Sequence, residues 1–246
     1  ATAARLDRGS FGNYFLGACY CELGDYESAV TALQAYHEVS RTPFNLLLLG
    51  FAHMQLDHRA EARWALREAY LLELDPKNYG WQGSLATLAE QKRREGDLDS
   101  ARADVMESLG WVERSDNVFR SPIRVLSLVA LGRICRDQGD ELGARAAFDQ
   151  AVSASSTTHR AVGMGHFRVQ ALAGRAAANQ DREDLNAAIE LFEKRASMNF
   201  GLVAVACDVV TACDLAHACN VLGDREGCRE YRERSRMLGM PERLLP

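Results

Sequence analysis

The chain is poor in the residues that favour β-structure. Aromatic residues make up 8% of its 246 residues and only 5 residues are proline, whereas alanine and leucine are abundant. Alanine and leucine are strong helix formers, while strands are enriched in aromatic and β-branched residues. The hydrophobic fraction of 47% and the charged fraction of 26% are ordinary for a globular protein. The sequence therefore predicts an all-α fold.

Other missing features argue against several classes of protein. The net charge of -5 leaves no basic surplus for nucleic acid, and no segment approaches the roughly 20 apolar residues that span a bilayer. We therefore expect neither direct nucleic-acid contact nor a membrane segment. The 7 cysteines form no Cys-x-x-Cys pair, and no Asn-x-Ser/Thr sequon occurs, which favours a cytoplasmic location. Because the first residue is alanine, we expect the chain to be a fragment or a processed product.

A sixfold repeat organises the sequence between residues 11 and 238. Each copy has a loop position between two helical patterns, a small residue seven positions earlier and, in most copies, a second small residue five positions later. The loop positions are Gly24, Asp57, Gly96, Gly139, Asp181 and Gly223, and the earlier small residues are Gly17, Gly50, Ala89, Gly132, Gly174 and Ala216. The later positions hold Ala29, Ala62, Ala101, Ala144 and Cys228, whereas the fifth copy has Asn186 there.

The small residues predict two antiparallel helices in close contact. A large side chain forced into such a contact costs about 1 to 3 kcal/mol. Glycine at the loop position ends the first helix in the left-handed conformation, and the aspartate that often follows caps the second helix. Large residues stand nine positions after the loop position, on the inner face of the second helix: Leu33, Leu66, Val105 and Phe148.

This unit resembles the tetratricopeptide repeat (TPR), a helix–turn–helix motif of about 34 residues. The residues that match the motif in the first copy are Leu16, Gly17, Tyr20, Gly24, Tyr26, Ala29 and Pro43. The spacing between the small residues grows from 33 to 39, 43, 42 and 42, and units of this length are similar to the helical arms of large bacterial transcription activators and signal-transduction ATPases. The resemblance implies one domain over 1–246, a right-handed superhelical solenoid of about six repeats. We expect these repeats at 11–43, 44–76, 82–115, 124–156, 166–198 and 208–238.

The resemblance also implies that the first helix of each unit lines a concave groove. The groove positions are apolar in the first two units and largely basic in the last three. These residues are Phe11, Tyr14, Phe44, Leu47, Phe51, Met54, Arg133, Arg136, Arg168, Arg175, His217 and Asn220. The pattern predicts a protein or peptide partner with hydrophobic and acidic anchors. Two simpler interpretations stay open: the apolar residues pack under a neighbouring domain, and the arginines pair with acidic residues of adjacent helices.

No group of residues indicates catalysis. Cys213 and His217 lie four positions apart on one predicted helix, but one helix cannot supply the four ligands of a structural zinc site. Buried cysteine more commonly acts as a small hydrophobic residue. His53 stands where the repeat motif places a core tyrosine, so we expect it to be packed in the interior. We expect no enzymatic activity, no metal and no cofactor.

Two functions remain open from the sequence. The first is a non-catalytic protein–protein interaction scaffold that forms the regulatory arm of a larger bacterial protein. The alternative is a ligand- or peptide-sensing arm that switches an N-terminal effector or transcription-activator domain. Such a ligand would have to bind two conformations with different affinity. The sequence predicts neither the identity of the partner nor the oligomeric state.

Overall fold

The computed structural model describes residues 11–75, 83–114, 119–156, 164–195 and 206–246. Within these ranges the chain forms twelve α-helices and one short 3-10 helix, and it contains no strand. The all-α prediction is confirmed. The helices are α1 (Phe11–Leu23), α2 (Tyr26–His37), α3 (Pro43–Gln55), α4 (Arg59–Glu73), α5 (Ser84–Arg94), α6 (Leu98–Arg114), α7 (Arg120–Asp137), α8 (Glu141–Ser156), α9 (Met164–Asn179), α10 (Arg182–Arg195), α11 (Ala206–Val221), α12 (Arg225–Met237) and η2 (Glu242–Leu244).

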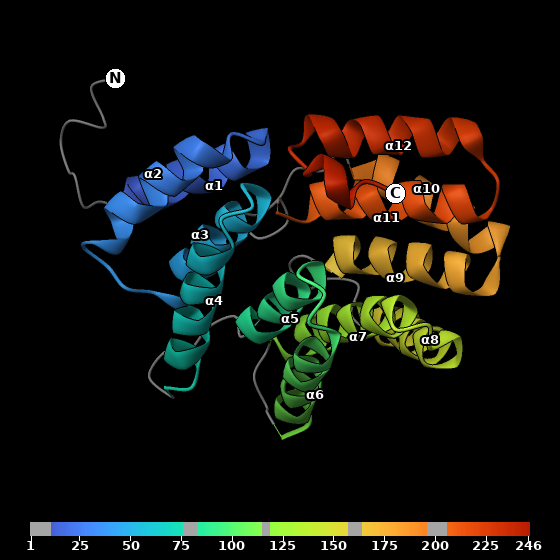
Figure 1. Ribbon diagram of the computed structural model, residues 1–246, viewed down its shortest axis with the longest axis horizontal. Helices are drawn as coiled ribbons and strands as arrows, with labels where there is room; N and C mark the ends of the chain where they lie inside the picture. The colour runs from blue at the N-terminus through green and yellow to red at the C-terminus, as the bar shows by residue number, and fades with distance from the viewer. Residues whose placement is uncertain (1–10, 76–82, 115–118, 157–163, 196–205) are drawn as a thin grey trace.

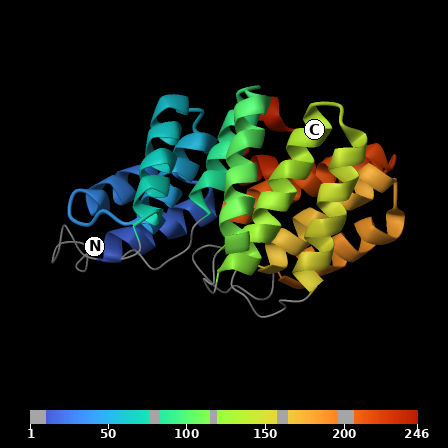
Figure 2. The same ribbon diagram turned by 90° about the horizontal axis from the view of Figure 1, so that it is seen from below.

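Consecutive helices pack in pairs, from α1 with α2 to α11 with α12. Each pair also contacts the next pair along the chain, which is the packing of a helical repeat. Figure 1 shows the pairs following one another around an arc, and Figure 2 shows the same arc from below. Among the helices in the described ranges, none combines the length and the apolar character that crossing a bilayer requires.

The turn inside each helix pair uses one residue with a left-handed backbone. Four of these residues are glycines at predicted loop positions, with φ between 73° and 85°, and Asp57 adopts φ 58° without being glycine. In the fifth pair the left-handed residue is Gln180, with φ 55°, one position before the predicted Asp181. Asp181 instead caps α10, because its Oδ1 accepts from the backbone N–H of Glu183 at 2.8 Å. The predicted register of the fifth copy is therefore wrong by one residue.

The corrected register explains the one break in the repeat pattern. Five residues after Gln180 stands Leu185, which is 1% exposed, and the next residue, Asn186, lies on the surface. A leucine therefore takes the place that alanine holds in the first four copies. Those alanines are all buried, as the pattern predicts: Ala29, Ala62, Ala101 and Ala144.

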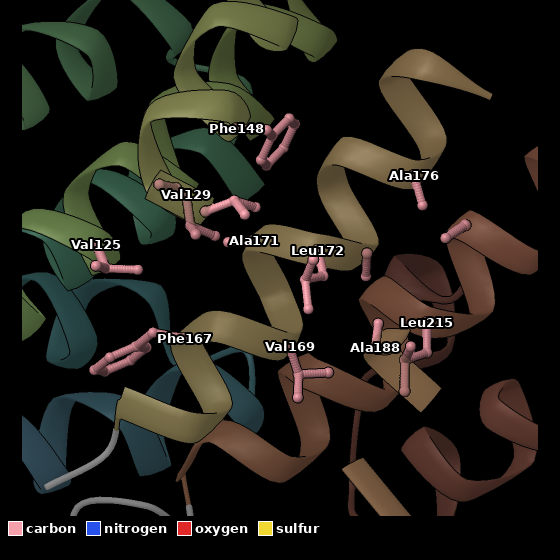
Figure 3. Packing of buried hydrophobic residues seen from close by; sticks show 14 of the residues in the cluster. Val125, Val129, Phe148, Phe167, Val169, Ala171, Leu172, Ala176, Ala188 and Leu215 are labelled. Carbon is pink, nitrogen blue, oxygen red and sulfur yellow. The ribbon is translucent and has the colours of Figure 1, made fainter. Parts of the chain in front are cut away.

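Close helix contact accounts for the glycines inside the first helices. A Cβ added to Gly50 would come within 2.6 Å of the Leu66 side chain, and one added to Gly132 would come within 2.7 Å of the Phe148 ring. Each contact joins a predicted small position to the predicted large position of the same unit. Phe148 also faces Gly174, so its ring fills the space between α7 and α9. Figure 3 shows Phe148 at this junction, beside the helix that carries Ala171 and Leu172.

The C-terminal segment after α12 joins the two ends of the arc. Gly239, with φ 86°, turns the chain back, and Met240 is buried in the hydrophobic cluster that contains Tyr26 of α2. The Tyr26 hydroxyl donates to the backbone carbonyl of Leu238 at 2.6 Å, and Arg243 pairs with Asp57. In Figure 1 this red segment begins at the end of α12 nearest α1 and folds back in front of α11. The first and last helix pairs are therefore in contact, which the repeat pattern did not predict.

Candidate functional site

A concavity lies on the inner side of the arc, and we call it the inner hollow. It encloses about 830 Å³ of non-atom space, part of which is open to solvent. All of its lining residues belong to the first helices of the six pairs, as the resemblance to the tetratricopeptide repeat implies. Its apolar wall includes Tyr14, Phe44, Leu47, Phe51, Met54 and Phe167.

Helix α3 supplies much of this apolar wall. The Thr42 side chain accepts from the backbone N–H of Asn45 at 3.3 Å, and Pro43 occupies the first turn, so the start of the helix is well defined. Asn45 donates its Nδ2 to the Leu33 carbonyl at 3.1 Å, which fixes α3 against α2. The residues of α3 that line the hollow are Phe44, Leu47, Leu48, Phe51 and Met54. They are spaced by about one helical turn and so fall on one face of the helix. This face is apolar because α3 consists almost entirely of apolar residues.

One end of the inner hollow is formed by a group of charged residues, most of whose side chains are buried or largely buried. We call this group the charge cluster, and its members are Glu90, Arg93, Arg94, Arg133, Asp137 and Asp214. Three helices contribute these residues: α5 carries the first three, α7 carries Arg133 and Asp137, and α11, which arrives from the far end of the arc, carries Asp214. The cluster therefore joins the middle of the chain to its last helix pair.

Arg133 is the most fully bonded member of the charge cluster. Its Nε donates to Asp214 Oδ1 at 3.2 Å, its Nη2 contacts the other carboxylate oxygen, and the same Nη2 donates to Gln170 Oε1 at 3.1 Å. Gln170 in turn donates to the Thr211 hydroxyl at 3.0 Å, and Glu90 lies 3.8 Å from Arg133 Nη1. Losing one partner of such a buried pair costs about 3 to 5 kcal/mol. This network therefore fixes α7, α9 and α11 to one another.

Glu90 holds the negative charge at the centre of the cluster. Its two oxygens each accept from Arg93 at 2.8 Å, and Arg93 also pairs with Asp137. Burial alone would raise the pKa of Glu90, but the charge and hydrogen bonds of Arg93, with the charges of Arg133 and Arg94, outweigh burial and lower the pKa well below its usual range. Glu90 is therefore ionised throughout the physiological pH range.

Arg94 is bonded less completely than the other two buried arginines. Its side chain is 4% exposed, and its Nε donates to Glu90 Oε1 at the long distance of 3.3 Å. Its Nη1 is buried and has no hydrogen-bond partner among the described residues. Burial lowers the pKa of Arg94, although the charge of Glu90 opposes this effect. The Arg94 side chain lines the inner hollow and also the polar concavity on the other side of the charge cluster, so its buried, unbonded Nη1 lies between the two.

A second, more polar concavity adjoins the charge cluster on its other side. We call it the polar hollow; it encloses about 740 Å³, and its lining includes Arg136, His217, Cys213 and Leu244. Burial, with the charge of Arg136, lowers the pKa of His217, which keeps the imidazole neutral near neutral pH. Burial also raises the pKa of Cys213 to about 11, and its thiol donates to the Leu244 carbonyl at 3.4 Å. Cys213 is thus not an activated nucleophile.

The structure brings half of the predicted groove residues into the inner hollow. These are Tyr14, Phe44, Leu47, Phe51, Met54 and Arg133. Arg133 is buried within ion pairs and is not part of an exposed stripe. Arg136 and His217 line the polar hollow.

The other predicted groove residues lie outside both hollows. Phe11 is 60% exposed at the start of α1, and Asn220 is exposed near the end of α11. Arg168 is half-buried on α9, and Arg175 donates two hydrogen bonds of 2.6 Å to Asp184. The pairing of Arg175 with Asp184 of the adjacent helix α10 matches the simpler interpretation of the basic stripe. Arg133 also pairs with an acidic residue, but Asp214 belongs to the distant helix α11. Whether any of these residues binds a partner stays a prediction.

Several residues of the site were not singled out from the sequence. Arg94 lies at a position that the repeat pattern does not mark as a groove position. Glu90 stands six residues before Gly96, as Phe51 stands before Asp57, so the pattern marks its position although the residue was not singled out. Phe167 falls on a groove position only in the corrected register of the fifth copy, thirteen residues before Gln180. For Arg94 the sequence signal was the basic run of residues 92–94 at the end of α5, which alone does not show burial. Asp214 and the C-terminal segment reach the site only because the arc brings the last helix pair close to the middle of the chain.

Two further observations bear on the class of protein. Within the described residues, no group of three or more histidine, cysteine or acidic side chains has the arrangement to hold a metal ion. His53, expected in the interior, is 4% exposed. No protein-family model matches the chain, and a search among curated proteins returns no match.

Proposed function

We propose that this protein is a non-catalytic interaction scaffold of the tetratricopeptide type, which binds a peptide or a partner domain in its inner hollow. In this proposal the helix pairs form a right-handed superhelix in the cytoplasm, and the whole serves as the regulatory arm of a larger bacterial protein. The first helices of all six pairs contribute to one concave, largely apolar wall, and this observation carries the proposal. Concave apolar surfaces with a few polar groups are the usual form of ligand sites.

The partner would bind through apolar anchors. Leu47 and Phe44 are partly buried, so their side chains retain surface that a partner could cover. An apolar helix or an extended segment laid in this groove would bury that surface, as in the helix-in-groove mode of recognition. Acidic groups of the partner would lie toward Arg136, at the border of the polar hollow. These charges would set orientation and association rate more than affinity.

The proposal is tested with short random peptides displayed on phage and selected against the wild-type chain. Selected peptides should lose about tenfold or more in affinity for Leu47→Glu, because a carboxylate in the apolar wall opposes burial of their anchors. Leu142→Glu is the matched control, since Leu142 is 79% exposed on α8 and lines neither hollow. Circular dichroism checks that both variants fold. Equal binding by wild type and Leu47→Glu would refute binding in the inner hollow.

The sensing arm remains a second candidate because of the closed arc. The contacts of the C-terminal segment with Tyr26 and Asp57 join the two ends of the arc through few residues. A ligand that prefers an open arc would have to break these contacts, which couples binding to shape. Small-angle X-ray scattering with and without a selected peptide separates the two functions: a change in radius of gyration supports the sensor, and an unchanged radius supports the scaffold.

A further inference from the structure

The inner hollow has one charged donor without an acceptor. Arg94 is 4% exposed, and its Nη1 is buried without a hydrogen-bond partner in the described part of the chain. An unpaired donor on a buried charged group is costly, so such a group marks a place where an acceptor would bind. Arg94 lies at the border between the apolar wall and the charge cluster.

The charge cluster cannot supply the acceptor that Arg94 needs. Its nearest carboxylate is Glu90, whose two oxygens already accept from Arg93 at 2.8 Å each. Asp214 is engaged by Arg133 through both oxygens, and Asp137 by Arg93. Among the described residues, Arg94 therefore makes one long hydrogen bond, in which its Nε donates to Glu90 Oε1 at 3.3 Å. The group that would complete the bonding of Arg94 is a hydrogen-bond acceptor for its Nη1, and hydrogen bonds from a charged donor are strongest to a charged acceptor.

The surroundings limit that anion to a small, singly charged group. The polar residues of the wall besides Arg94 are Thr87, Glu90, Arg133 and Gln170, and Glu90 and Arg133 are engaged in ion pairs. The rest of the wall is aromatic and aliphatic, with Phe44, Phe51 and Phe167 among its residues. The amide of Gln170 is already used by Arg133 and Thr211. A phosphate would need several further donors, whereas a carboxylate is satisfied by one guanidinium. The rest of the ligand must be apolar to match the walls.

We propose that the inner hollow binds a small amphiphilic carboxylic acid, with its carboxylate on Arg94 and its hydrocarbon body against Phe44, Phe51 and Phe167. The proposal goes beyond the scaffold function and does not depend on it. A small acid of this kind would occupy the same apolar wall as a protein partner and would compete with it.

The test uses octanoate as the probe and isothermal titration calorimetry on the full chain. Octanoate should bind the wild type about tenfold or more tightly than octanol, which has the same apolar body without the charge. Octylamine should bind more weakly than octanoate, because an ammonium group has no acceptor for the hydrogen bond that Arg94 Nη1 would donate. Equal affinities for octanoate and octanol, or no octanoate binding, would overturn the proposal.

Variants then locate the carboxylate. Arg94→Met keeps an unbranched apolar side chain and removes the charge, so octanoate affinity should fall about tenfold or more while octanol affinity is unchanged. Arg229→Met is the matched control, since Arg229 is exposed on α12 and lines neither hollow. Equal octanoate affinity of Arg94→Met and wild type would refute the assignment to Arg94.

A measurement on the wild type alone guards against unfolding of Arg94→Met. Octanoate labelled with ¹³C at the carboxyl carbon reports its own ionisation in the bound state by nuclear magnetic resonance. Pairing with a guanidinium should lower the pKa of the bound carboxylate below that of free octanoate. A raised pKa would mean a carboxylate buried without a cation and would overturn the proposal. Failure of the peptide selection would leave each of these results unaffected, so the two proposals fail separately.

Discussion

Replacing Gly132 by alanine tests the packing on which the repeat depends. The added Cβ would lie 2.7 to 2.8 Å from three atoms of the Phe148 ring, which is closer than carbon atoms pack. Phe148 is 2% exposed, and Gly174 of α9 closes its other side, so the ring cannot move away freely. Overpacking of this kind costs about 1 to 3 kcal/mol. Alanine recovers up to about 1 kcal/mol through its better helix propensity, so we expect a net loss of about 1 to 2 kcal/mol.

Gly110→Ala is the matched control for this substitution. Gly110 also lies inside a helix, α6, but its added Cβ would meet only the flexible end of Arg114, at 3.4 Å. The same chemical change should therefore stabilise the protein at Gly110, by up to about 1 kcal/mol. Opposite signs at the two glycines would separate the effect of packing from that of propensity.

Thermal unfolding followed by far-ultraviolet circular dichroism measures both effects. For a chain of this size the loss at Gly132 corresponds to a fall in Tm of roughly 2 to 8 °C. Adding Phe148→Leu should relieve the clash, so the double variant should cost less than the sum of the two single variants. A Gly132→Ala protein as stable as Gly110→Ala, or strict additivity with Phe148→Leu, would refute the close contact between Gly132 and Phe148.

Two further predictions concern a buried carboxyl group and the C-terminal segment. Burial raises the pKa of Glu73 to about 8, although the hydrogen bonds from Ser84 oppose this. Above about pH 4.5 the folded protein therefore retains a proton that the unfolded chain releases. The free energy of unfolding should then fall as the pH rises from about 4.5 to 8. Glu73→Gln should flatten this slope by up to about 1.4 kcal/mol per pH unit. Urea denaturation across this pH range checks the slope, and parallel slopes for the two proteins would contradict it. Tyr26→Phe removes the hydrogen bond to the Leu238 carbonyl and should cost about 1 kcal/mol; amide hydrogen exchange should accelerate in residues 239–246, and unchanged protection there would show that the bond does not hold the segment.

The sequence determined the local units of the fold because their signals act over short distances. A turn position with a left-handed backbone favours glycine or a polar residue that tolerates a positive φ. A close contact between two helices requires a residue with no side chain or a very small one. Gly24 and Gly132 therefore mark their positions without reference to the rest of the chain. The fifth unit was misplaced by one residue because Gln180 adopts the left-handed conformation although its residue type gives little indication of it. The next residue, Asp181, is of a type common in turns and was therefore assigned to the loop position, whereas in the structure it caps α10.

The tertiary structure alone decided the environment of the candidate site. The sequence marked Arg133 as basic, but only the approach of α11 places Asp214 against it and buries Arg133. The assignment of Arg94 to the candidate site also depends on the tertiary structure. The burial of its side chain and the shortage of acceptors for its Nη1 result from helices that lie far apart in the chain. Periodicity fixes which face of a helix is apolar, because that pattern is local. The curvature that closes the arc is the sum of many small packing angles between pairs, and so no local pattern shows which distant residues meet on its inner side.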